Sequence, residues 1–111
     1  MGIFKPAGGV VFAEVHLEEA FNNLAENSPL KKSVQKVICK LKENAFCGEN
    51  IPKRLIPKEY IQKYKIDNLW WLPLSDAWRL VYSIVNPGKI EILAVIIDYY
   101  SHKEYERKFG Y

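Results

Sequence analysis

The sequence is poor in the residues from which disulfide frameworks and zinc sites are built. Its 111 residues include two cysteines, Cys39 and Cys47, and two histidines, His16 and His102. Two thiols in a chain of this length are not a disulfide scaffold, and together with two histidines they suggest no zinc-type ligand cluster. We therefore expect reduced thiols, a cytoplasmic location, no metal and no other cofactor.

Long hydrophobic runs and common phosphate-binding motifs are also missing. The longest apolar run covers residues 92–97, whereas a transmembrane helix needs about 20 apolar residues. Residues 1–9 contain no apolar stretch of the kind found in signal peptides. The chain has no Walker loop, no GxGxxG motif and no G-x-S-x-G motif. We therefore expect neither membrane insertion nor the enzyme classes that depend on these motifs.

The composition that remains is that of a globular protein. Hydrophobic residues make up 49% of the chain and charged residues 26%, and the formal net charge is +3. This length and balance predict one folded domain over residues 1–111. The mild positive charge is compatible with RNA or an acidic partner, and equally with a slightly basic protein that binds neither.

The N-terminal half predicts a strand followed by a helical hairpin. Residues 10–15 are rich in β-branched and aromatic side chains, and residues 17–27 carry apolar side chains at helical spacing. Ser28 and Pro29 then supply a cap and a first position for a second helix over residues 30–44. The lysines of this helix are expected mostly on its outer face: Lys31, Lys32, Lys36, Lys40 and Lys42.

The C-terminal half predicts three strands. A less regular segment over residues 45–68, with a short helix at 57–64, precedes them. The strands cover residues 69–74, 78–85 and 90–99, and their short connections predict an antiparallel meander. The apolar run of the third strand is typical of a strand buried on both faces.

A short helix ends the chain. Ser101 and Glu104 have the spacing of a capping box, so a helix is expected over residues 102–109, with Gly110 as its stop. The fold class is therefore α+β, with the order β-α-α-β-β-β and a terminal helix. An antiparallel sheet would carry the N-terminal helical hairpin.

Arg79 is the first candidate for a functional role. It alternates with Trp78 and Leu80, so it should lie on the opposite face of its strand. An arginine in an apolar strand needs an anionic partner or an opening to water. The partner can be a carboxylate such as Asp76 or Glu91, or it can be a phosphate, which a guanidinium binds with two parallel hydrogen bonds.

His102 is the second candidate. It would stand in the first turn of the terminal helix and share a face with Tyr105 and Glu106. The free N–H groups of that turn suit a phosphate, and the helix end favours a neutral imidazole that can act as a base. The alternative is a solvated histidine near the end of the chain.

Basic and aromatic residues elsewhere permit RNA contacts without requiring them. Lys53 and Arg54 stand side by side, and with the lysines of the second helix they could line a basic groove or form an ordinary solvated face. The three tryptophans could stack on bases, but tryptophans in strands usually belong to the core.

The C-terminal part of the chain resembles the RelE/ParE toxin superfamily, the small toxins of type II toxin–antitoxin modules. In that family a strand carries an arginine two or three residues before a tyrosine, as Arg79 and Tyr82 stand here. The next strand is apolar and leads into a His-x-x-Tyr segment, matched by His102 and Tyr105. The segments that carry the resemblance are residues 78–84, 92–98 and 102–105.

The resemblance implies a RelE-like mRNA interferase, a metal-independent endoribonuclease that often cuts mRNA on the ribosome. The ribose 2′-OH attacks the adjacent phosphate and leaves a cyclic phosphate and a free 5′-OH. The resemblance implies proton transfer by His102, phosphate binding by Arg79, and orientation of the ribose or shared proton transfer by Tyr105. It implies added positive charge from three further residues: Lys53, Arg54 and Lys103.

The resemblance also implies partners and leaves alternatives open. The partners would be a cognate antitoxin protein, mRNA and the ribosome, with no membrane and no metal. One alternative is a ParE-like toxin that inhibits gyrase, although ParE-type members lack the catalytic histidine that His102 would supply. The other is an interaction module without catalytic activity.

Overall fold

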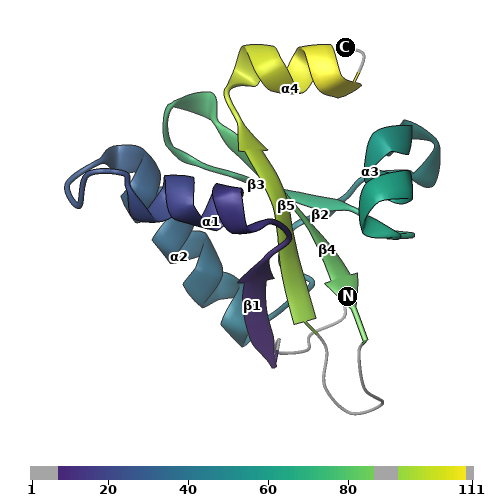
Figure 1. Cartoon of the computed structure of the whole chain (residues 1–111), viewed down its shortest axis with the longest axis horizontal. Helices are drawn as coiled ribbons and strands as arrows, with labels where there is room; N and C mark the ends of the chain where they lie inside the picture. The colour runs from purple at the N-terminus through teal and green to yellow at the C-terminus, as the bar shows by residue number, and fades with distance from the viewer. Residues whose placement is uncertain (1–7, 87–92, 110–111) are drawn as a thin grey trace.

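The computed structural model describes residues 8–86 and 93–109, which form an α+β fold around one sheet (Figure 1). Eleven elements follow one another along these residues: β1 (Gly9–Phe12), α1 (Val15–Asn22), α2 (Pro29–Glu43), β2 (Glu49–Asn50), the 3-10 helix η1 (Lys53–Leu55), α3 (Lys58–Tyr64), β3 (Trp70–Pro73), the 3-10 helix η2 (Ser75–Ala77), β4 (Arg79–Val85), β5 (Leu93–Tyr100) and α4 (His102–Phe109).

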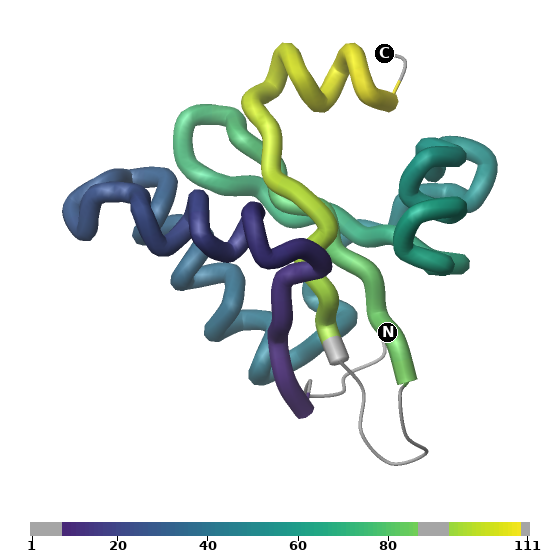
Figure 2. Tube along the Cα trace, viewed as in Figure 1, coloured from purple at the N-terminus to yellow at the C-terminus, as the bar shows by residue number. Residues whose placement is uncertain are grey.

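The sheet has five strands in the order β1-β5-β4-β3-β2. Strands β2, β3, β4 and β5 pair antiparallel, which confirms the predicted meander. Strand β1 pairs parallel with β5, and Figure 2 shows the two strands side by side. The expected all-antiparallel sheet is therefore wrong at this edge. The sequence pattern shows that a segment is a strand. It does not show which strand the segment pairs with, or whether the two run parallel.

Two further differences concern the strands. Strand β2 is two residues long, too short to give a periodic pattern, and it was not expected. The third predicted strand began at residue 90; its described part, β5, runs from Leu93 to Tyr100, and residues 90–92 lie outside the described residues.

Each face of the sheet buries its own hydrophobic cluster. Helices α1 and α2 cover one face, where Val34 and Leu41 pack with Leu80 of β4. Helices α3 and α4 contribute Tyr60 and Tyr105 to the cluster on the other face. Side chains along β4 alternate between the two clusters, because successive residues of a strand point to opposite faces. This arrangement confirms that β5, which lies between β1 and β4, is buried on both sides.

Both predicted helix caps are present. The Ser28 hydroxyl accepts a hydrogen bond from the backbone N–H of Lys31 at 3.3 Å, and Pro29 occupies the first turn of α2. At α4 the Glu104 N–H donates to the Ser101 hydroxyl, and the Glu104 carboxylate accepts from the Ser101 N–H, each at 3.3 Å. This reciprocal pair is a capping box, and it fixes where α4 begins.

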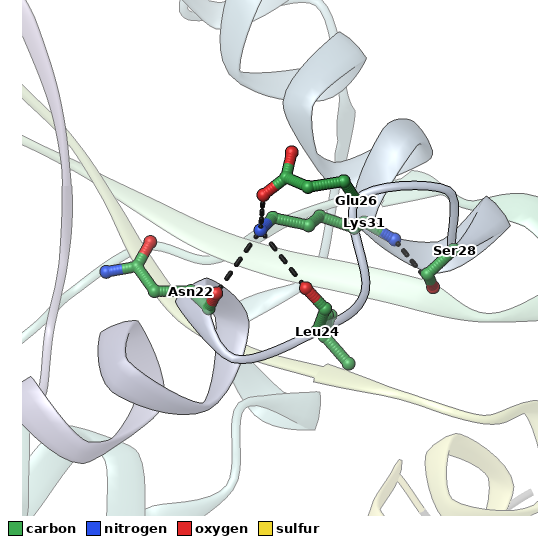
Figure 3. A network of polar contacts seen from close by, with 5 residues as sticks. All are labelled: Asn22, Leu24, Glu26, Ser28 and Lys31. Carbon is green, nitrogen blue, oxygen red and sulfur yellow. Dashed lines mark hydrogen bonds and ion pairs between the residues drawn. The ribbon is translucent and has the colours of Figure 1, made fainter.

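Lys31 is a correction to the expected outer face of α2, because its side chain is buried. Its Nζ atom donates to the backbone carbonyls of Asn22 at 3.2 Å and Leu24 at 3.1 Å, and pairs with Glu26 at 2.6 Å (Figure 3). Carbonyls at the end of a helix have no partner within that helix, and a cation there is favourable. Lys31 therefore ties the end of α1 to the start of α2.

Gly48 permits a close crossing between the loop after α2 and the sheet. Its N–H donates to the Tyr82 hydroxyl at 3.1 Å, and that hydroxyl donates to the Ala45 carbonyl at 2.8 Å. A Cβ atom at residue 48 would lie 2.7 Å from the Trp71 carbonyl oxygen and 2.8 Å from the Tyr82 hydroxyl. A side chain at this position would therefore push the loop off the sheet.

We predict that Gly48→Ala lowers the free energy of unfolding by about 1–3 kcal/mol, as overpacking of a tight site does. The matched control is Cys47→Ala at the neighbouring exposed residue, which should change stability by less than about 0.5 kcal/mol. Urea unfolding followed by tryptophan fluorescence measures both. Equal stability of the Gly48 variant and the wild type would show that the loop is free to move away from the sheet.

Candidate functional site

Arg79 stands at the start of β4, and its guanidinium contacts two neighbouring aromatic rings whose centres are 6.2 Å apart. Its Cζ atom lies 4.5 Å from the centre of the Trp71 ring and 4.4 Å from the centre of the Tyr105 ring. The side chain is half-buried and makes no hydrogen bond or ion pair with the described residues. Asp76, one of the expected carboxylate partners, does not pair with it, and Glu91 lies outside the described residues. Stacking on aromatic faces, rather than a carboxylate, therefore holds this cation.

The turn before Arg79 has an unusual backbone. Asp76 and Ala77 have φ values of 55° and 62°, and the Trp78 N–H donates to the Ser75 carbonyl at 3.1 Å. Positive φ at both central residues belongs to the type I′ turn, whose twist matches that of a two-stranded hairpin. Non-glycine residues adopt this conformation at a cost. The turn thus fixes the start of β4, and with it the position of Arg79, at the expense of local strain.

His102 lies close to Arg79 along the sheet. Arg79 is paired in register with Tyr100, the last residue of β5, and His102 begins α4 two residues later. The imidazole forms an ion pair through Nε2 with Glu106, one turn along α4, and 51% of the side chain is exposed. The start of β4 and the start of α4 lie at the same end of the sheet (Figure 1), and the register brings Arg79 and His102 there.

Tyr105 is 1% exposed and belongs to the hydrophobic cluster under α4. Its ring stacks on Phe109 with centres 4.4 Å apart, and its other neighbours include Arg79 and Tyr100. The predicted face shared by His102, Tyr105 and Glu106 is thus divided by depth. Tyr105 points into the core and supports the guanidinium, whereas the other two side chains meet at the surface.

The three remaining predicted residues are exposed and come from two elements. Lys53 and Arg54 form part of η1, and Lys103 lies in the first turn of α4. None of them makes an ion pair with a described residue. Their charges are therefore available to a partner.

A hollow of about 380 Å³ lies between the end of β5 and α4. None of the residues predicted from the sequence lines it; its walls are Asp98, Tyr99, Tyr100, Glu104, Arg107 and Lys108. Burial raises the pKa of the Asp98 carboxyl, and its hydrogen bond from the Tyr99 N–H, at 2.9 Å, opposes that rise. A bulge between Val81 and Tyr82 shifts the register just before Asp98. The sequence did not indicate that Asp98 is buried beside a hollow, because the register shift cannot be read from the alternation of side chains along the strand.

Glu14 is the centre of a second polar cluster that the sequence did not indicate. Its carboxylate accepts a hydrogen bond from the Tyr64 hydroxyl at 2.7 Å and pairs with Lys63 and His16. The bond from Lys63 is the main cause that lowers the pKa of Glu14. The cluster joins the start of α1 to the end of α3, residues that are distant in the sequence.

The chain matches no protein-family model, no curated protein and no solved structure. The resemblance to the RelE/ParE superfamily therefore rests on the residues that carry it. Among residues 8–86 and 93–109, no His, Cys, Asp and Glu side chains gather in a group of three or more that could hold a metal ion. No helix in the same ranges is both long and apolar enough to cross a bilayer.

Asp98 gives the site region a testable pH dependence. Its pKa is higher in the folded chain than the value of about 3.9 expected when unfolded. Its contribution to stability is therefore fully present below the unfolded pKa, and is lost as the pH rises through the folded pKa. We predict that Asp98→Asn raises the unfolding midpoint at pH 7 and that this gain shrinks toward pH 3.

The control for this prediction is Asp67→Asn, which makes the same change at an exposed residue. Thermal unfolding at a series of pH values measures both variants. A gain for Asp98→Asn that stays constant from pH 3 to pH 7 would contradict the assigned cause.

Proposed function

We propose that this protein is the toxin of a type II toxin–antitoxin module, a RelE-like endoribonuclease that cleaves mRNA on the ribosome without a metal. The observation that carries the proposal is the half-buried Arg79, which lies over the rings of Trp71 and Tyr105 and has no carboxylate partner among the described residues. The resemblance at Arg79, Tyr82, His102 and Tyr105 supports it.

The aromatic contacts suit Arg79 to phosphate binding. The rings of Trp71 and Tyr105 hold the side chain but do not use up the guanidinium N–H donors as a carboxylate would, so these donors stay open to a phosphate. Holding the side chain in place before binding reduces the entropy lost when a phosphate is bound. Because no described carboxylate neutralises the cation, its charge is available to stabilise the phosphorane that forms when the 2′-oxygen attacks.

His102 supplies proton transfer in this proposal. The 2′-OH loses a proton as its oxygen bonds to phosphorus, the bond to the 5′-oxygen breaks, and that oxygen gains a proton. The products are a 2′,3′-cyclic phosphate and a 5′-OH. Glu106 engages Nε2 of His102 and orients the exposed ring, so Nδ1 is the nitrogen left for proton transfer. Tyr105 acts through its ring, which holds Arg79 in place.

The remaining predicted residues bind the RNA strand on either side of the scissile phosphate. Lys53, Arg54 and Lys103 are exposed and contribute positive potential, which attracts RNA regardless of sequence. The cognate antitoxin would bind over Arg79 and His102 and neutralise this surface. Such a partner explains how a cell tolerates the nuclease.

An alternative is a domain that binds a partner and cleaves nothing, either a gyrase inhibitor or an inactive interaction module. Two observations favour it: His102 is already paired with Glu106, and Tyr105 is buried in the core. A histidine held by a carboxylate is also a common structural arrangement. This alternative predicts an intact phosphate-binding Arg79 without strand cleavage.

We predict that His102→Ala slows mRNA cleavage about 100- to 10,000-fold, the cost of losing a proton-transfer group. Arg79→Met should slow it about 100- to 1,000-fold, as removal of an oxyanion donor does. Arg79→Lys keeps the charge but loses the planar fork, so it should restore only a small part of the rate. Primer extension on mRNA from a translation extract measures cleavage.

Lys58→Met, at an exposed residue of α3, is the control and should cleave at the wild-type rate. Thermal unfolding checks that each variant is folded. Cleavage at the wild-type rate by both folded variants, Arg79→Met and His102→Ala, would refute the proposed site. Wild-type protein that cuts no mRNA but blocks gyrase supercoiling would establish the ParE-like alternative.

A further inference from the structure

Three lysines form a straight ridge along the outer face of α2. Lys32, Lys36 and Lys40 follow one another at intervals of four residues, and all three are exposed. Residues four apart lie on the same face of a helix, and a rise of about 1.5 Å per residue gives the ridge a length of about 12 Å. We call these residues the α2 lysine ridge. Gln35 and Cys39, which are also exposed, lie beside it.

No described residue forms an ion pair with a ridge lysine. The described ion pairs of lysines involve Lys31, Lys63 and Lys108, and none involves a ridge lysine. By contrast, the buried Lys31 next to the ridge has two carbonyls and a carboxylate as partners. Lys31 therefore has a structural role in α2, whereas the three ridge lysines have no partner among the described residues.

The helix dipole accounts for only one of the three ridge charges. Lysines near a helix C-terminus are favourable because of the helix dipole, and that accounts for Lys40. Lys32 stands in the first turn, where acidic residues are favourable, and α2 has no acidic residue in that turn. The positive end of the dipole therefore adds to the charge of Lys32. This arrangement costs some stability and produces a strongly positive end on the ridge.

The ridge and Arg79 belong to opposite sides of the sheet. The buried face of α2 packs on the cluster that contains Leu80, so the ridge points away from the sheet on that side. Arg79 contacts Trp71 and Tyr105, which belong to the cluster on the other face. A short RNA strand bound at Arg79 therefore does not reach the ridge. Whatever binds there is a second segment of the same large partner, or a separate molecule.

We infer that the α2 lysine ridge is a second nucleic-acid contact, which binds the phosphate backbone of a structured RNA without reading its sequence. Charge complementarity selects this occupant: three unpaired ammonium groups spaced over about 12 Å face a chain that carries one phosphate about every 3.4 Å along its axis. The inference goes beyond the proposed cleavage and does not depend on it, because it concerns affinity and not chemistry.

The test measures the salt dependence of binding to a labelled 2′-O-methyl RNA oligonucleotide, which lacks the attacking hydroxyl. Each phosphate contact that is lost reduces the slope of log K against log salt by about 0.7, so the variant Lys32→Gln/Lys36→Gln/Lys40→Gln should flatten it by about 2. At low salt the affinity should fall about tenfold or more. An unchanged slope in the triple variant would overturn the inference.

The matched control removes the same charge elsewhere, with Lys58→Gln/Lys65→Gln/Arg107→Gln at exposed residues of α3, its C-cap and α4. It should change the slope by less than half as much. An equal change in both triple variants would show that net charge, and not the ridge, attracts RNA. Binding of phosphatidylserine vesicles or polyglutamate that is lost in the ridge variant, with the RNA slope unchanged, would assign the ridge to a membrane or an acidic protein and overturn the inference.

Cys39 allows a direct check because it lies between Lys36 and Lys40 on α2. In a Cys47→Ser background it is the remaining thiol of the two in the sequence, and a photo-crosslinker attached there should capture the oligonucleotide. The same reagent in a Cys39→Ser/Cys47→Ser/Gln62→Cys protein, on the exposed side of α3, should capture much less. Equal capture would contradict a localised contact.

Cleavage assays separate this inference from the proposed function. The ridge variant should cut a short RNA substrate at the wild-type rate, because the substrate does not reach α2. A flattened slope together with a wild-type protein that cleaves nothing would refute the nuclease and leave the ridge. Lost cleavage in Arg79→Met, together with an unchanged salt slope in the ridge variant, would support the nuclease and refute the ridge as an RNA contact.

Discussion

The pairing of β4 with β5 is the interaction on which the rest of the structure depends. The two strands lie next to each other inside the sheet, and each of their faces carries a separate hydrophobic cluster. Neither helical layer has a place to pack unless this pair is formed. The pairing also sets the functional region, because its register places Arg79 opposite Tyr100, the last residue of β5, two residues before α4 begins.

Arg79 is held in a way that keeps its charge available. An ion pair would have fixed the side chain and neutralised it at once, whereas contacts with the rings of Trp71 and Tyr105 hold the side chain and leave the cation without a counter-ion among the described residues. The cost is the partial desolvation of a charge, which the two aromatic faces offset in part. An arginine in this state is suited to bind a phosphate that arrives from outside.

The positively charged side chains of the chain fall into groups that differ in burial and in partners. Lys31 is buried and joins two helices, Lys63 and Lys108 pair with carboxylates, and the exposed cations on α2, η1 and α4 are left to a partner. A net charge of +3 hides this division, because the paired groups cancel in the sum. The position of each cation, and not the total, decides what the surface attracts.

Most local elements could be predicted from short-range patterns. Ser28 and Pro29 start α2, and Ser101 and Glu104 start α4. The pattern of apolar residues marks four of the five strands and misses the two-residue β2, because capping and side-chain alternation depend on near neighbours. The sequence also singled out Arg79 and His102. Only the tertiary structure decided the parallel pairing of β1, the burial of Lys31 and the aromatic contacts of Arg79. Each of these brings together residues that are distant in the sequence or sets the depth of a side chain, and neither follows from local spacing.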